Sequence, residues 1–86
     1  MDNVCEALLE AYRRCLEALK AILQAARESW VHKDAAVMLD LMPEAFRVHQ
    51  AAYNINRLYI KRKFGEDALR KLDLLIAELT EKCMEE

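Results

Sequence analysis

Few residues in this chain are of the types that perform chemistry, and none has the spacing that chemistry requires. The only histidines are His32 and His49, and the only cysteines are Cys5, Cys15 and Cys83. A metal site in a helical protein normally uses pairs such as His-x-x-x-His, Glu-x-x-His or Cys-x-x-Cys, which place two ligands on one helix face. No such pair occurs. We therefore expect no metal site and no cofactor.

The cysteines are expected to pack as small apolar side chains rather than to react. A reactive thiol needs a neighbouring base or cation and partial exposure, whereas each cysteine here falls among apolar residues of a predicted helix. Cys5 and Cys15 are separated by about 15 Å along one helix axis, and a disulfide tolerates roughly 7 Å between Cα atoms. With a single glycine the chain also has no glycine-rich phosphate loop. We predict that the protein is not an enzyme.

A row of cations forms the candidate nucleic-acid surface. This basic face consists of Arg47, Arg57, Lys61, Arg62 and Lys63, with Gln50 and Asn54 between them. Cations at three- and four-residue spacing can follow a phosphate backbone. The same row begins with Asp40 and Glu44, however, and the dipole of a helix favours cations near its carboxyl end. A solvated face is therefore the preferred interpretation, with nucleic-acid binding and then binding of an acidic protein surface as the alternatives.

Three helical segments must position these residues. The first is predicted from residue 3 to about residue 30 and carries two adjacent apolar rows, as expected for a helix inside a bundle. Asp34 is expected to cap the second, in which Pro43 either produces a kink or separates a short helix, residues 35 to 41, from a longer one. Gly65 should end this segment, and a shorter third helix is predicted over residues 66 to 84.

The second segment has one apolar row and one row that is more polar. The predicted core row is Met38, Leu41, Ala45, Val48, Ala52, Ile55 and Tyr59. The other row contains a polar cluster, His49, Tyr53 and Asn56. These three residues form a buried hydrogen-bonded network that fixes register, pair with the same residues of a second copy across a dimer axis, or occupy a partly wet edge.

The short third helix cannot cover the whole hairpin before it. The uncovered end carries aromatic and thioether side chains of the kind found at surfaces that bind helices. The predicted interface consists of Trp30, Met38, Leu41, Met42 and Phe46. Its occupant is a second copy of the chain, a different protein, or residues 35 to 42 folded over the hairpin as an internal cap.

Length and composition favour one all-α domain over residues 1 to 86. Apolar residues make up 55% and charged residues 33%, with one Gly and one Pro, which is typical of a small up-down helical bundle. We expect three main helices completed by homodimerisation. The net charge of −2 gives no global attraction to nucleic acid or membranes, no apolar run reaches about 20 residues, and the start is unlike a signal peptide, so a cytoplasmic location is expected. The function predicted is that of a protein-binding adaptor, regulator or inhibitor.

Overall fold

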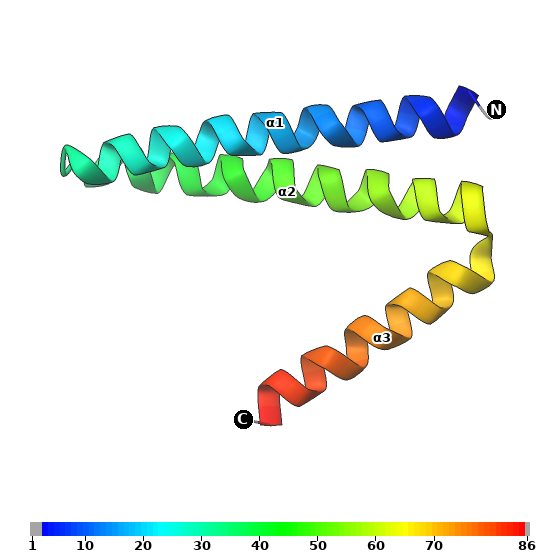
Figure 1. Ribbon diagram of the computed structural model, residues 1–86. Helices are drawn as coiled ribbons and strands as arrows, with labels where there is room; N and C mark the ends of the chain where they lie inside the picture. Colours follow the sequence, from blue (N-terminus) through cyan, green and yellow to red (C-terminus); the bar gives the residue numbers. More distant parts are fainter. Residues whose placement is uncertain (1–2, 86) are drawn as a thin grey trace.

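The computed structural model describes residues 3–85, which form three α-helices and no strand (Figure 1). The helices are α1 (Asn3–Val31), α2 (Ala35–Phe64) and α3 (Glu66–Glu85). This confirms the all-α prediction. The α1 and α2 helices run antiparallel as a long hairpin, while α3 leaves the far end of α2 at an open angle (Figure 1).

A seven-residue repeat holds the hairpin together. The half-buried side chains of α1, apart from Ala11, recur at alternating spacings of three and four: Cys5, Leu8, Tyr12, Cys15, Leu19, Ile22, Ala26 and Ser29. In α2 the row predicted as its core has the same spacing and is half-buried or buried: Met38, Leu41, Ala45, Val48, Ala52, Ile55 and Tyr59. This is the pattern with which two helices interlock along a coiled-coil seam. Asn56, Arg57 and Ile60 are half-buried as well. Ala52, which is 4% exposed, is the only buried side chain among residues 3–85.

The seam of α1 differs from the two rows expected from its sequence. The expected rows are Val4, Leu8, Ala11, Cys15, Ala18, Ile22 and Ala25 on one side, and Cys5, Leu9, Tyr12, Leu16, Leu19, Leu23, Ala26 and Trp30 on the other. Up to Ala26 the seam alternates between the two rows, and all the remaining members except the half-buried Ala11 are exposed. The reason is that α1 has one neighbour: it packs on α2, and no described part of it contacts α3. The expectation of two neighbours for α1 is therefore not met within a single chain.

The helix ends follow the sequence signals. Asp34 caps α2, with its carboxylate accepting a hydrogen bond from the Val37 amide at 3.2 Å. Gly65 ends α2 with φ of 93° and ψ of 171°, and its amide donates to the Lys61 carbonyl at 3.0 Å. Pro43 lies inside α2, which continues through it from Ala35 to Phe64. A separate short helix before Pro43 is not observed.

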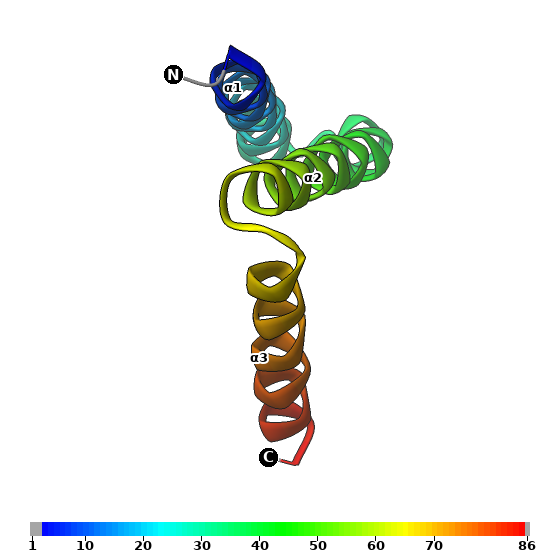
Figure 2. The same cartoon turned by 90° about the vertical axis from the view of Figure 1, so that its right-hand side faces the viewer.

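The α3 helix contacts α2 only near the hinge and then extends away from the hairpin (Figures 1 and 2). Ala68, Leu69 and Leu72 at its start are half-buried, whereas every described residue after Leu72 is exposed. The radius of gyration is 16.5 Å, against about 12 Å for a compact domain of this length. A single chain therefore leaves α3 without the bundle contacts that its sequence favours.

Candidate protein-binding surface

Large apolar side chains remain exposed along one side of the hairpin. On α1 they occur every seventh residue, immediately after seam positions: Leu9, Leu16, Leu23 and Trp30. The equivalent position at the start of α2 is Met42, with Leu39 and Phe46 beside it. In an antiparallel helix pair these positions border the same side of the seam. We call these seven residues the hairpin face; large exposed apolar patches of this kind mark interaction sites in soluble proteins.

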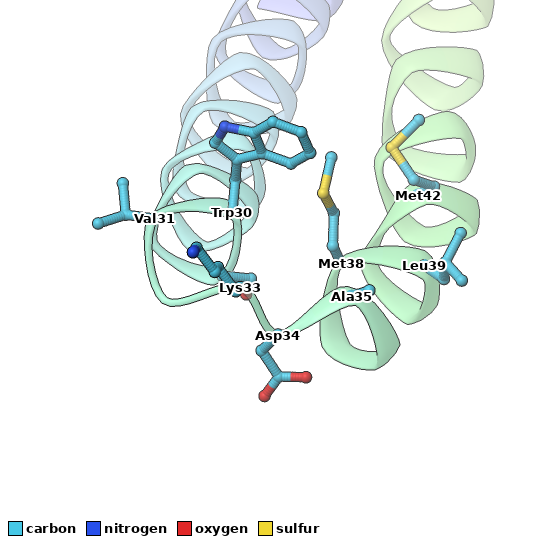
Figure 3. Close-up of a pocket in the computed structure, with 9 residues that line it drawn as sticks. Trp30, Val31, Lys33, Asp34, Ala35, Met38, Leu39 and Met42 are labelled. Atoms are coloured by element: carbon cyan, nitrogen blue, oxygen red, sulfur yellow. The ribbon is translucent and has the colours of Figure 1, made fainter.

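The hairpin face ends in a pocket at the turn between α1 and α2. The pocket has a volume of about 800 Å³ and is lined by Ser29, Trp30, Val31, Lys33, Asp34, Ala35, Met38, Leu39 and Met42. Figure 3 shows the Trp30 indole and the thioether of Met38 extending toward the space between the two helices. Trp30 is 70% exposed and Met42 55%, so most of the apolar wall is in contact with water. We call this the tip pocket.

The structure brings together part of the interface expected from the sequence. Trp30, Met38 and Met42 all line the tip pocket. Leu41 is half-buried in the α1–α2 seam, and Phe46, 67% exposed, is not among the pocket residues. The fold of residues 35 to 42 explains the exposure, because they belong to α2 and do not close over the hairpin as a cap.

The predicted polar cluster does not form a network in the described chain. His49 and Tyr53 are exposed and Asn56 is half-buried. No hydrogen bond joins these three residues within 3–85; instead the Tyr53 hydroxyl accepts from Arg57 Nη1 at 3.5 Å, one turn away. The partly wet edge fits this geometry better than the buried network.

Intramolecular pairing occupies much of the basic face. Arg47 pairs with Glu44 at 2.5 Å, and Lys61 pairs with Glu66 at 3.4 Å. Arg57 donates hydrogen bonds to the Asp73 carboxylate of α3 from Nη1 and Nη2. Asp73 raises the pKa of Arg57 above its ordinary value through these hydrogen bonds. Cations that already have carboxylate partners attract phosphate less strongly than free ones.

Lys63 makes a different kind of contact at the end of α2. Its ammonium donates a hydrogen bond to the Tyr59 hydroxyl at 2.9 Å, and this bond raises the pKa of Lys63. The same ammonium lies 5.5 Å from the Tyr59 ring centroid and 5.6 Å from that of Phe64. These cation–π contacts hold Lys63 against the helix rather than extending it toward a ligand.

Within residues 3–85 no group of three or more His, Cys, Asp or Glu side chains is arranged to hold a metal ion. This part of the chain also contains no disulfide; Cys15 is half-buried in the seam, whereas Cys83 is exposed on α3. The prediction that every cysteine packs in a seam therefore fails for Cys83 in the single chain. None of the described helices combines the length and hydropathy needed to cross a bilayer.

Comparison with known proteins assigns this arrangement to no group: no protein family, no curated protein and no solved structure matches the chain. The sequence predicts a packed row for Leu9 and Leu16, whereas the structure exposes both on the hairpin face. Their signal was a spacing of seven that continues through Leu23 to Trp30. The Arg57–Asp73 pair was also missed, because its members are sixteen positions apart on different helices.

Proposed function

We propose that this protein is a non-catalytic binding module, an adaptor, regulator or inhibitor, that holds an amphipathic α-helix of a protein partner on its hairpin face. The observation that carries the proposal is the continuity of the Leu9–Trp30 row with the tip pocket. A helix docks in such a site through apolar anchors at i, i+3, i+4 and i+7. The thioethers of Met38 and Met42 adapt readily to the shape of such anchors.

Charge beside the hairpin face indicates what kind of helix fits. Arg13, Lys20 and Arg27 recur along α1 at seven-residue spacing, each four positions after a leucine of the hairpin face, and residues four apart are neighbours on a helix surface. Lys20 and Arg27 are exposed and form no ion pair with any described residue. The bound helix should therefore carry carboxylates next to its apolar stripe, because complementary charge adds association rate and orientation.

Nucleic-acid binding through the basic face has less support. Three of its members, Arg47, Arg57 and Lys61, already pair with carboxylates of the same chain. We expect no retention of a 20-base-pair DNA duplex at about 150 mM salt, where screening weakens phosphate contacts. Tight binding under those conditions, abolished by Arg62→Glu with Lys63→Glu, would favour the alternative function.

Trp30 is the only tryptophan in the chain, so its fluorescence reports directly on the tip pocket. The probes are three synthetic 20-residue peptides without tryptophan: an amphipathic helix with Leu anchors and Glu flanks, the same helix with Lys flanks, and a scrambled version of the first. The Glu-flanked helix should shift the Trp30 emission to shorter wavelength and protect it from acrylamide. The Lys-flanked helix should bind more weakly, and the scrambled peptide should have no effect.

Two variants make the assignment specific. Met42→Asp places a charge in the pocket wall and should abolish the fluorescence response, because docking would bury an unpaired carboxylate. Glu17→Ala, at an exposed position on the outer side of α1, should leave it unchanged. If all three peptides fail to alter Trp30, or if the scrambled peptide works as well as the helix, the proposed function is wrong.

A further inference from the structure

The α3 helix is itself an amphipathic helix without a partner. Its apolar stripe after the hinge consists of Leu72, Leu75, Ile76, Leu79 and Cys83, and all but Leu72 are exposed. The sequence gives this stripe the spacing of a packed helix, yet no described residue of α1 contacts it. The chain therefore presents both an unoccupied helix-binding face and an unoccupied helix.

The stripe and the face agree in length and in charge. The 20 residues of α3 span about 30 Å, and the α1 row from Leu9 to Trp30 spans about the same distance. The carboxyl-terminal half of α3 carries Glu78, Glu81 and Glu85 against Lys82. These carboxylates match the basic rim of Lys20 and Arg27 on α1, and neither Glu78 nor Glu81 is paired within the described chain.

A chain's own α3 is poorly placed to fill its own hairpin face. It starts at the end of the hairpin opposite the tip, and α1, at 29 residues, is about 44 Å long against about 30 Å for α3. Folding back would leave Trp30 and Met42 uncovered. The Arg57–Asp73 and Lys61–Glu66 ion pairs also hold the start of α3 against α2 in the open position.

We infer that two copies of this chain exchange their α3 helices, each α3 lying on the hairpin face of the other copy. The inference rests on the helix-binding function proposed above and names the helix. A two-fold axis makes the two contacts identical, so the assembly closes at two chains. In the pair, four hairpin helices and two exchanged helices form the bundle that one chain alone lacks.

The exposed area of the single chain agrees with this assembly. Its accessible surface is 7093 Å², whereas a compact protein of 10.0 kDa exposes about 5,200 Å². The excess of roughly 1,900 Å² per chain corresponds to about 3,800 Å² for a pair, which is within the range of obligate homodimers. An interface of that size is sufficient for a stable dimer.

A complementation experiment with the full chain tests the exchange. One variant, Leu16→Glu with Leu23→Glu, disables the hairpin face; the other, Ile76→Glu with Leu79→Glu, disables the α3 stripe. Light scattering and analytical ultracentrifugation give the dimer dissociation constant for each variant alone and for their mixture. All four positions lie on the surface of the single chain, and circular dichroism checks that its helices persist.

Exchange predicts that the native chain dimerises and that each variant alone dimerises more weakly by roughly 100-fold or more, because docking would bury unpaired carboxylates. Mixing the two should restore a heterodimer of intermediate affinity, since one intact α3 meets one intact hairpin face. Ala21→Glu on α1 and Leu74→Glu on α3, both on outer sides, are the matched controls and should dimerise like the native chain.

The other outcomes each identify a different arrangement and overturn the exchange. If the variant with the disabled α3 stripe still dimerises alone, the hairpin faces pack on each other; if the variant with the disabled hairpin face does so, the α3 helices pair. A native chain that stays monomeric at 100 μM would also refute the exchange. In any of these cases a Trp30 response to the Glu-flanked peptide would still support the proposed helix-binding function. If that peptide also gave no Trp30 response, the helix-binding function and the α3 exchange would both be wrong.

Discussion

Arg57 of α2 donates two hydrogen bonds to the carboxylate of Asp73 on α3, one of them from Nη2 to Oδ2 at 3.1 Å. The two residues are sixteen positions apart, so this pair fixes the direction in which α3 leaves the hinge. A planar guanidinium that binds both carboxylate oxygens also restricts rotation, which a single ion pair does not.

The first prediction concerns the titration of Asp73. Hydrogen bonds from Arg57 hold the pKa of Asp73 below its ordinary value. Because the folded pKa lies below the unfolded one, the pair stabilises the folded chain above the unfolded pKa, and this stabilisation is lost as pH falls through the folded pKa. The carboxyl ¹³C shift of Asp73 should titrate below pH 4, approximately the ordinary aspartate value. Arg57→Gln should move the midpoint up toward that value, and Arg70→Gln should not.

The second prediction concerns the tightest point of the hairpin. Ala52 is buried against α1, so Ala52→Leu should lower the free energy of unfolding by about 1 to 3 kcal/mol through overpacking. Ala51 is adjacent and exposed, and Ala51→Leu should change it by less than about 0.5 kcal/mol. Urea denaturation of both variants measures the difference. Equal effects at the two positions would contradict the seam described here.

A third prediction follows from the hinge conformation. The φ of 93° and ψ of 171° at Gly65 lie in a region that glycine alone occupies readily, and a Cβ there would meet no atom within 4 Å. Gly65→Ala should therefore cost about 1 to 3 kcal/mol through backbone strain rather than a clash. A chemically synthesised chain with D-alanine at this position is the control, because its preferred dihedrals are the mirror image. It should unfold at the same denaturant concentration as the native chain.

The fourth prediction tests the continuity of α2. Pro43 cannot donate a backbone hydrogen bond inside a helix and normally costs about 3 kcal/mol there. Pro43→Ala should raise the free energy of unfolding by an amount up to that value and leave the helical content unchanged or slightly higher. If a separate helix began at Pro43, the same change would remove a favourable first residue and would not stabilise the chain. Circular dichroism with thermal unfolding separates these outcomes.

The sequence predicted the local structure of this protein much better than its assembly. The core row of α2, from Met38 to Tyr59, and the capping roles of Asp34 and Gly65 are confirmed, because they depend on spacing and backbone preference within one segment. The sequence does not show which apolar row of α1 packs on α2. Apolar residues occupy four of every seven positions of α1, so several seams are equally possible. Which of them packs depends on how many partners the helix has.

The candidate surface was predicted in part for the same reason. Trp30, Met38 and Met42 could be assigned to an exposed end from helix lengths alone. The open direction of α3 could not be predicted from the sequence, because it depends on the dihedrals of Gly65 and on ion pairs between α2 and α3. No local pattern encodes contacts of that range.

Only Gly65 separates α2 from α3, so a change in its two backbone dihedrals rotates α3 as a rigid helix. The α3 helix is about 30 Å long, so each degree of rotation at Gly65 moves its carboxyl end by about 0.5 Å. A change of about 20° thus displaces that end by roughly 10 Å, the width of a helix, while both helices stay intact. A rotation of that size changes two backbone dihedrals and requires the Arg57–Asp73 and Lys61–Glu66 ion pairs to rearrange, so these pairs limit how far α3 adjusts to the spacing of bound elements.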